Sequence, residues 1–334
     1  MKKNIIVLHI GLGKTGTSTL QKKVLPLIAK KRNLKYWGNE YKDEDNIERK
    51  ILGAELVNHE YKMKLGKRCK KIEIKDDYLI SDEDLSSFRD ANYMEEYAEK
   101  NLIAFGPDAH IFLSIREPRS WFTSLYIQLC VQEKPLIKPK YFFLSSDQYS
   151  ERLPNAKFNY NKFGYKKLID MYKSRFNKVT YFKYESLKDM NFLKDVFQLN
   201  EEEHKQIKDL YSKNKVNRSL GKYSIKILNK FSLLMALFGI HFISKYSNEV
   251  ILDRANENYV HSMRTKKEKR NFKSFILKSI NNILNYKFLF YKVLDNLLPY
   301  EKVSVNFEEI NDLDINALIE EYLSLDEWKT YTKS

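Results

Sequence analysis

The feature that most constrains the fold is a strand pattern that runs directly into a glycine-rich loop. Residues 5–10 form an apolar run, as expected for a strand that is buried on both faces. The loop, residues 11–19, is followed by apolar side chains at helical spacing, and Pro26 is expected to kink or end that helix. A strand, a glycine turn and a helix in this order predict the first unit of a parallel α/β sheet.

Three further strand patterns extend this prediction to a whole domain. Residues 78–80, 109–115 and 179–182 are strand-like, and a helical pattern follows each of them. We therefore predict a P-loop-type three-layer α/β fold, with a central parallel sheet flanked by helices and ligands bound beyond the carboxyl ends of the strands. Residues 1–210 would form this core, and the charged, irregular residues 40–77 would be an insertion or a substrate-facing excursion.

The C-terminal region, residues 211–334, is predicted to be basic, mainly helical and packed on the core. No acidic residue occurs between Asp209 and Glu249, and Lys222, Lys226 and Lys230 would line one helix face. A solvated basic face is the preferred interpretation. The alternative is association with an anionic membrane surface, because basic amphipathic helices can lie on one.

Charge and cysteine content narrow the classes of partner and compartment. The net charge of +15 predicts a surface that attracts anions such as nucleotides, nucleic acid, acidic glycans or membranes. Cys69 and Cys130 are far apart, which argues against a disulfide scaffold or a zinc site. The longest later apolar run, residues 231–243, is shorter than the ~20 residues of a membrane span. We expect a cytoplasmic protein, either free or peripheral to a membrane.

The order of residues in the loop indicates which phosphate chemistry it suits. Glycines allow the backbone N–H groups to point at an anion, and the next helix adds its positive N-terminus. Gly11 and Gly16 have the separation found in a Walker A loop, but Thr17 stands where the Walker lysine would be, and Lys14 lies mid-loop instead. This placement suits the bridging oxygen of a 5′-phosphosulfate better than a β/γ-phosphate pair.

The loop resembles the 5′-phosphosulfate loop of sulfotransferases that use 3′-phosphoadenosine 5′-phosphosulfate (PAPS), and it is most similar to their bacterial, carbohydrate-type members. Two positions depart from the family pattern: Gly13 replaces a usual proline, and Thr19 replaces a tryptophan that stacks on adenine in cytosolic relatives. The resemblance implies that the donor contacts Gly13, Lys14, Thr15, Gly16, Thr17, Ser18 and Thr19.

A second motif resembles the 3′-phosphate site of the same family. Arg116 follows a predicted strand, Pro118 comes two residues later, and Ser124 stands eight after the arginine. An arginine presents a planar fork to phosphate oxygens, and proline suits the first turn of a helix. Trp121 occupies the position of the usual second arginine, so the role of nearby Arg119 stays open.

The resemblance also implies a reaction, an in-line displacement at sulfur by an acceptor hydroxyl. Lys14 would stabilise the leaving oxygen, and no metal is implied. The general base is expected to be Glu83, which follows the strand at 78–80, with His59 and Glu40 as alternatives. His9 lies within the first strand and is expected to be structural. The acceptor would be a glycan or glycolipid, and no nucleic-acid partner is expected.

The motifs cover residues 4–190, where the Tyr-Glu-x-Leu segment beginning at Tyr184 is also similar to the family and is expected to be structural. Two other functions compete with sulfuryl transfer. A kinase with a P-loop is opposed by the position of Lys14 and by the lack of a clear magnesium-binding aspartate. A nonenzymatic anion-binding protein is the other candidate, and it lacks a recognised nucleic-acid motif.

Overall fold

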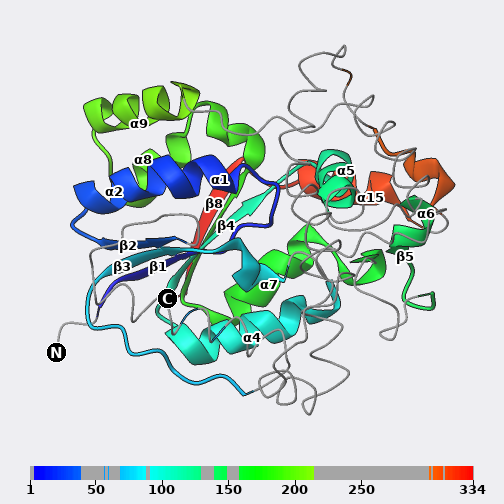
Figure 1. Cartoon of the computed structure of the whole chain (residues 1–334), viewed down its shortest axis with the longest axis horizontal. Helices are drawn as coiled ribbons and strands as arrows, with labels where there is room; N and C mark the ends of the chain where they lie inside the picture. Colours follow the sequence, from blue (N-terminus) through cyan, green and yellow to red (C-terminus); the bar gives the residue numbers. More distant parts are fainter. Residues whose placement is uncertain are drawn as a thin grey trace, which may run out of the picture.

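A six-stranded sheet forms the centre of the computed structural model, in the order β2-β3-β1-β4-β7-β8 (Figure 1). The structure describes residues 4–38, 56, 59, 68–87, 91–128, 139–148, 158–213, 301, 304–310 and 313–333. The strands are β1 (Ile6–His9), β2 (Lys35–Gly38), β3 (Tyr78–Ser81), β4 (His110–Ile115), β7 (Lys178–Lys183) and β8 (Trp328–Thr332). All neighbouring pairs are parallel except β7 and β8, which are antiparallel.

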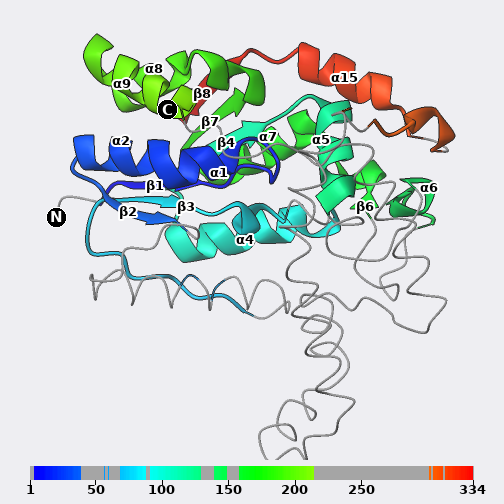
Figure 2. The same ribbon diagram turned by 45° about the horizontal axis from the view of Figure 1, so that its top comes forward.

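Helices cover both faces of this sheet (Figures 1 and 2). One face carries a continuous helical run made of α1 (Thr17–Thr19), the π-helical η1 (Leu20–Val24) and α2 (Leu25–Lys31), together with α8 (Asn191–Phe197) and α9 (Glu201–Lys213). The other face carries α4 (Met94–Phe105) and α7 (Tyr165–Arg175). The predicted α/β fold, with a mostly parallel sheet flanked by helices, is thus confirmed.

The remaining elements gather beyond the carboxyl ends of the strands. They include α5 (Pro118–Tyr126), α15 (Ile315–Leu323), α6 (Pro139–Phe142) and a small parallel sheet of β5 (Phe143–Leu144) and β6 (Phe158–Asn159) (Figure 1). The described chain also contains short 3-10 turns: η2 (Glu83–Ser86) and η3 (Ala91–Tyr93) between β3 and α4, η5 (Tyr160–Lys162) between β6 and α7, η6 (Tyr184–Lys188) between β7 and α8, and η7 (Phe307–Glu309) before α15.

The alternation of side chains along the strands explains why the core has two halves. Val7 of β1 and Phe112 of β4 face the layer of α2 and α8, whereas Leu8 and Leu113 pack in the cluster formed with α4 and α7. Successive residues of a strand point to opposite faces, so a strand that is apolar throughout fills both halves. This is why the sheet is buried on both sides where β1 and β4 run.

Three details differ from the sequence-based expectation. Strands β2 and β8 were not predicted, and β8 places part of the C-terminal region within the sheet. The helix does not end at Pro26, which occupies the first turn of α2, directly after the π-helical turns. Proline lacks the N–H that an interior helical position donates, and the change from π-helical to α-helical hydrogen bonding falls next to this position.

The predicted basic helix with Lys222, Lys226 and Lys230 lies outside the described residues, as does most of the predicted excursion at 40–77. Within the part of the chain that the structure describes, no helix is long and apolar enough to cross a membrane.

Candidate functional site

The glycine loop joins β1 to α1 and is pressed against two neighbouring elements. Gly16 precedes α1 with a φ of 78°, a left-handed conformation that glycine adopts without penalty. A Cβ at Gly16 would lie 2.7 Å from Tyr184 Cε2, and a Cβ at Gly11 would lie 1.9 Å from Ser114 Oγ. Glycine is therefore required at these two positions because of the close approach of η6 and β4.

Hydrogen bonds from β4 and α5 hold the loop in this shape. Thr15 is fully buried, and its hydroxyl donates to the Leu12 carbonyl and lies 2.5 Å from Ser114 Oγ. Trp121 Nε1 donates to the Gly13 carbonyl over 2.9 Å. The side chain of Thr15 therefore braces the loop from inside.

Arg116 connects the two predicted motifs. Its Nη1 donates to the Lys14 carbonyl over 2.8 Å and to Ser124 Oγ over 3.2 Å. Its guanidinium carbon lies 4.7 Å from the centre of the Tyr184 ring, at cation–π distance. Among the described residues, the buried Nε of Arg116 has no hydrogen-bond partner. Leaving a guanidinium donor buried and unpaired is costly, and an anion bound beside it would remove that cost.

The α5 helix places Ser124 as the sequence pattern predicts. Glu117 caps it by accepting from the amides of Arg119 and Ser120 over 3.0 and 2.8 Å, and Pro118 occupies the first turn. Ser124 lies two turns along, and its hydroxyl donates to the Ser120 carbonyl. Arg119 turns away toward α15, where its Nη2 donates to Asn316 Oδ1 over 2.9 Å.

Glu83, the expected base, is brought to the loop. The hydroxyl of Thr17 donates to Glu83 Oε2 over 2.5 Å, although 66 positions separate the two residues. Both follow the carboxyl ends of adjacent parallel strands, β1 and β3, which is why they meet at one edge. Asp82 caps η2 by accepting from the Asp84 amide over 3.0 Å, which holds the start of η2 in place.

His9 and His59 are both buried side chains. His9 is completely buried, its Nδ1 lies 2.7 Å from Ser81 Oγ, and burial lowers its pKa to about 3. It is therefore neutral near pH 7 and links β1 to β3. His59, the first alternative base, is buried with its Nε2 3.2 Å from Asn101 Oδ1 on α4. Glu40, the other alternative, lies outside the described residues.

The sequence pattern did not single out Ser114 and Tyr165, which also shape this site. Ser114 supports the loop, and Tyr165 donates its hydroxyl to the Arg116 carbonyl. Trp121 and Tyr184, which the motifs include without a binding role, support the loop and Arg116 respectively. No comparable signal in the sequence points to Tyr165, which reaches the site from α7 only after the fold has formed.

Comparison of the chain with family models, with curated proteins and with solved structures gave no match. The arrangement around Lys14, Arg116 and Glu83 must therefore be interpreted from its own geometry. It offers a glycine loop at a helix N-terminus, a guanidinium with a buried unpaired donor, and a carboxylate within one hydrogen bond of the loop. Together, the loop and the guanidinium suit an anionic ligand, and the carboxylate can accept a proton beside that ligand.

Proposed function

We propose that the chain is a sulfotransferase that moves a sulfuryl group from PAPS to an acceptor hydroxyl, with a P-loop-type phosphosulfate site. The observation that carries this proposal is the position of Arg116. It lies between the loop at Lys14 and the helix residue Ser124, so one guanidinium belongs to both motifs. A ligand with phosphate groups at both ends of a nucleoside would need two such adjoining anion sites.

The residues present fit such a donor. Lys14, Gly16, Thr17 and Ser18 surround the start of the helical run, where backbone N–H groups and the helix dipole favour an anion. Arg116 has its buried Nε available, among the described residues, for a second phosphate. When bound, PAPS supplies an activated sulfuryl group and a phosphate leaving group.

The residues of the chain would then divide the work of the transfer. The acceptor oxygen forms a bond to sulfur while the bond from sulfur to the bridging phosphate oxygen breaks. Lys14 and the loop amides balance the negative charge that grows on the leaving oxygen. Glu83 takes the proton from the attacking hydroxyl, and the products are the sulfated acceptor and 3′,5′-adenosine bisphosphate.

The contact between Thr17 and Glu83 supports this assignment of the base. A general base must lie within hydrogen-bond reach of the hydroxyl that it deprotonates. That hydroxyl must in turn lie against the sulfur, next to the loop. A carboxylate that accepts a 2.5 Å hydrogen bond from a loop hydroxyl lies beside the loop, where such an acceptor would be bound. We propose a glycan or glycolipid as the acceptor, reached from the cytoplasm or at a membrane surface.

The first test measures binding by isothermal titration calorimetry, with 3′,5′-adenosine bisphosphate, AMP and ATP as ligands. Arg116→Ala should weaken the bisphosphate about tenfold or more and leave AMP nearly unchanged, because a charged hydrogen bond contributes about 1.5–3 kcal/mol. Lys14→Ala should weaken both ligands. Arg119→Ala is the matched control, since its guanidinium bonds Asn316 instead. Equal or tighter binding of ATP by the unaltered chain would overturn the proposal.

The second test separates binding from chemistry. Glu83→Gln keeps an oxygen that can accept from Thr17, so the affinity for 3′,5′-adenosine bisphosphate should be preserved. The rate of transfer from labelled PAPS to a glycan panel should fall by about 10²–10⁴-fold, the usual contribution of a general base. A Glu83→Gln protein with an unchanged rate would show that another group takes the proton.

A further inference from the structure

The helix α15 lies beside the elements that hold Arg116, although it belongs to neither sequence motif. It packs against α5 and α7, beyond the carboxyl ends of the strands (Figures 1 and 2). Two short paths of contacts lead from α15 to Arg116. One path ends at the backbone carbonyl of this arginine and the other ends at its guanidinium.

The first path begins at the N-terminus of α7. Gly164, the residue before this helix, has no side chain that could cap it. Glu321 of α15 supplies the cap instead, because its Oε1 accepts from the Lys166 amide over 2.7 Å and its Oε2 accepts from the Tyr165 amide over 3.2 Å. A carboxylate is also favoured at the positive end of a helix. The position at which α7 begins is therefore held by α15.

Tyr165 connects the start of α7 to Arg116. Its side chain is fully buried, and its hydroxyl donates to the Arg116 carbonyl. Burial, followed by the charge of Glu117, raises the pKa of Tyr165 well above its usual value. The hydroxyl therefore keeps its proton and remains a donor to the arginine backbone.

The second path runs from α15 through η6. The hydroxyl of Tyr322 donates to Glu185, and the centre of the Tyr322 ring lies 5.4 Å from the centre of the Tyr165 ring. Glu185 directly follows Tyr184, whose ring centre lies 4.7 Å from the guanidinium carbon of Arg116. The hydrogen bond to Glu185 therefore holds the turn that carries the ring beneath the guanidinium.

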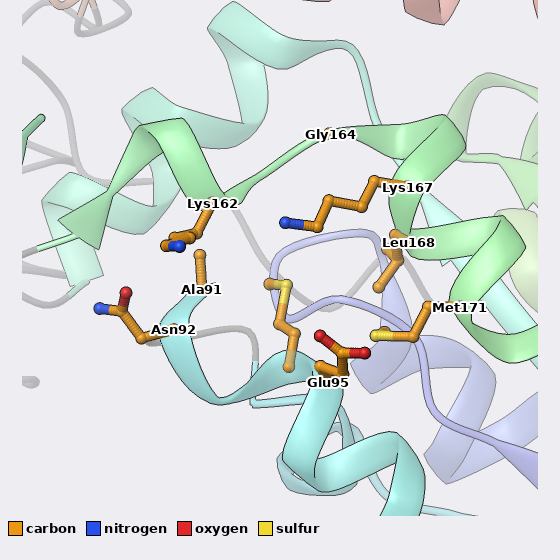
Figure 3. A pocket seen from close by; sticks show the side chains of 9 residues that line it. Ala91, Asn92, Glu95, Lys162, Gly164, Lys167, Leu168 and Met171 are labelled. Atoms are coloured by element: carbon orange, nitrogen blue, oxygen red, sulfur yellow. The ribbon is translucent and has the colours of Figure 1, made fainter. Parts of the chain in front are cut away.

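The opposite side of α7 offers less support to the start of this helix. A cavity of about 120 Å³ lies there, between the start of α7 and the start of α4 (Figure 3). Gly164, Lys167 and Met171 line it on one side, and Asn92 and Glu95 line it on the other. Side chains beside a cavity have fewer packing partners than those in a close-packed interior. The start of α7 therefore depends more on its contacts with α15.

The orientation of the Arg116 guanidinium matters for binding an anion. Among the described residues, its buried Nε has no hydrogen-bond partner, and this N–H is available to a phosphate only while the guanidinium keeps its direction. A guanidinium bonds an anion through a planar fork, so a rotation of this group weakens the contact. A side chain that is restrained before binding also loses less conformational entropy when the ligand binds.

We infer that Glu321, Tyr322 and Tyr165 are positioning residues of the proposed 3′-phosphate subsite, and that α15 completes this subsite by holding Arg116 in its binding orientation. The inference rests on the proposed function, and it extends the donor site to a helix of the C-terminal region. The three side chains act through Arg116 and need no contact with the nucleotide.

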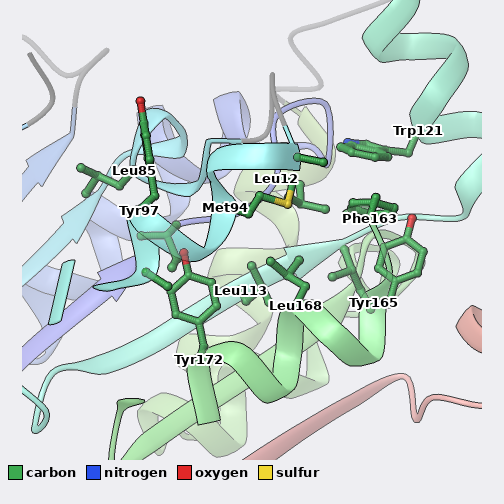
Figure 4. Packing of buried hydrophobic residues seen from close by; sticks show 14 of the residues in the cluster. Leu12, Leu85, Met94, Tyr97, Leu113, Trp121, Phe163, Tyr165, Leu168 and Tyr172 are labelled. Carbon is green, nitrogen blue, oxygen red and sulfur yellow. The ribbon is translucent and has the colours of Figure 1, made fainter. Parts of the chain in front are cut away.

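The first test removes one hydroxyl from each of two tyrosines of α7. Figure 4 shows Tyr165 near Trp121, and Tyr172 farther along the helix. Tyr165→Phe should raise the Kd for 3′,5′-adenosine bisphosphate about two- to tenfold, the change that one hydrogen bond makes, and leave the Kd for AMP nearly unchanged. Tyr172→Phe removes an equally buried hydroxyl two helical turns away and should change neither Kd. Equal weakening of both nucleotides in Tyr165→Phe, or no weakening, would overturn the inference.

The second test concerns α15 itself. Glu321→Ala removes the cap of α7, so it should weaken the bisphosphate selectively, though less than Tyr165→Phe does. Tyr322→Phe interrupts the second path and should act in the same direction. Glu320→Ala is the matched control, because Glu320 is exposed on the same helix. If Glu321→Ala and Tyr322→Phe both bound the bisphosphate as Glu320→Ala does, α15 would have no part in positioning Arg116.

Nitrogen-15 NMR of the arginine side chains gives a readout that needs no nucleotide. In the full chain, the Arg116 Nε–H signal, assigned by its loss in Arg116→Lys, should shift in Tyr165→Phe. The Arg175 signal should stay in place, because its Nε bonds Glu99 at the other end of α7. An unmoved Arg116 signal would contradict the positioning role.

The two readouts distinguish this inference from the proposed function. If the unaltered chain does not bind 3′,5′-adenosine bisphosphate, the proposed function fails, and the NMR shift alone decides whether Tyr165 positions Arg116. If the nucleotide binds and Tyr165→Phe changes neither the Arg116 signal nor the preference over AMP, only the inference is refuted.

Discussion

Replacement of Gly16 by alanine should disturb both the loop and Arg116 through one methyl group. At a φ of 78°, an L side chain costs about 1–2 kcal/mol. The new Cβ would also lie 2.7 Å from Leu187 Cδ1 and Tyr184 Cε2, and overpacking of this kind typically costs about 1–3 kcal/mol. The sum is about 2–5 kcal/mol, and in a chain of 334 residues a loss of about 3 kcal/mol should lower the Tm by about 4 °C.

The same substitution should weaken nucleotide binding, because the Tyr184 ring that must move is the ring on which Arg116 rests. Loss of that cation–π contact is worth about 0.5–1 kcal/mol, or about a two- to fivefold increase in the Kd for 3′,5′-adenosine bisphosphate. Urea unfolding gives the stability change, and calorimetry gives the Kd. Both measurements should be made on the same preparation.

Gly164→Ala provides the control for this experiment. Gly164 has an extended backbone with a φ of −176°, and a Cβ there would lie no closer than 3.6 Å to any neighbouring atom. Its replacement should cost less than about 1 kcal/mol, in line with an N-cap change. If Gly16→Ala proved no more destabilising than Gly164→Ala, the crowding between the loop and η6 would be refuted.

Two further predictions concern buried polar groups. Tyr322→Phe removes the hydroxyl that donates to Glu185, so urea unfolding should show that the free energy of unfolding falls by about 1–3 kcal/mol. Glu185→Gln keeps an acceptor for this hydroxyl and should lower the free energy of unfolding by less. A larger loss in Glu185→Gln than in Tyr322→Phe would contradict this role of the hydroxyl. Burial lowers the pKa of both His9 and His110 from 6.5 to about 3, so the unfolded chain takes up protons first and stability should fall as the pH drops below 6.5 toward 3. Each histidine contributes up to about 1.4 kcal/mol per pH unit to this fall in the free energy of unfolding. The slope of that free energy against pH, measured by urea unfolding, should be shallower in His110→Gln. An identical slope in that variant would refute the contribution of His110.

The parts of the site that were predictable are those set by strand ends. Lys14, Glu83 and Arg116 each follow a strand that the apolar pattern identifies, and parallel neighbours bring their carboxyl ends to one edge. Their proximity then follows from topology. The contact between Arg116 and Ser124 was equally accessible, because both lie within one short segment whose helix begins at Pro118.

Other parts depend on contacts that no local pattern carries. β2 is only four residues long, and it contains a lysine and a glycine that weaken any strand signal. β8 is half-exposed along its length, so it lacks a marked apolar pattern. Tyr165 and Tyr184 reach Arg116 from separate elements, and their side-chain directions are decided by packing. Such positions become evident only in three dimensions.

The pairing of β8 with β7 has a consequence for the order in which the chain can fold during synthesis. β7 ends at Lys183 and β8 begins at Trp328, so the ribosome must make all the intervening residues before the sheet can be completed. At about 5–20 residues per second, this takes roughly 7–30 s. During that time the edge of β7, the neighbour of β4, has unpaired backbone groups that can recruit another chain. Slower translation would lengthen this exposure, so the yield of folded protein should depend on how quickly synthesis reaches β8.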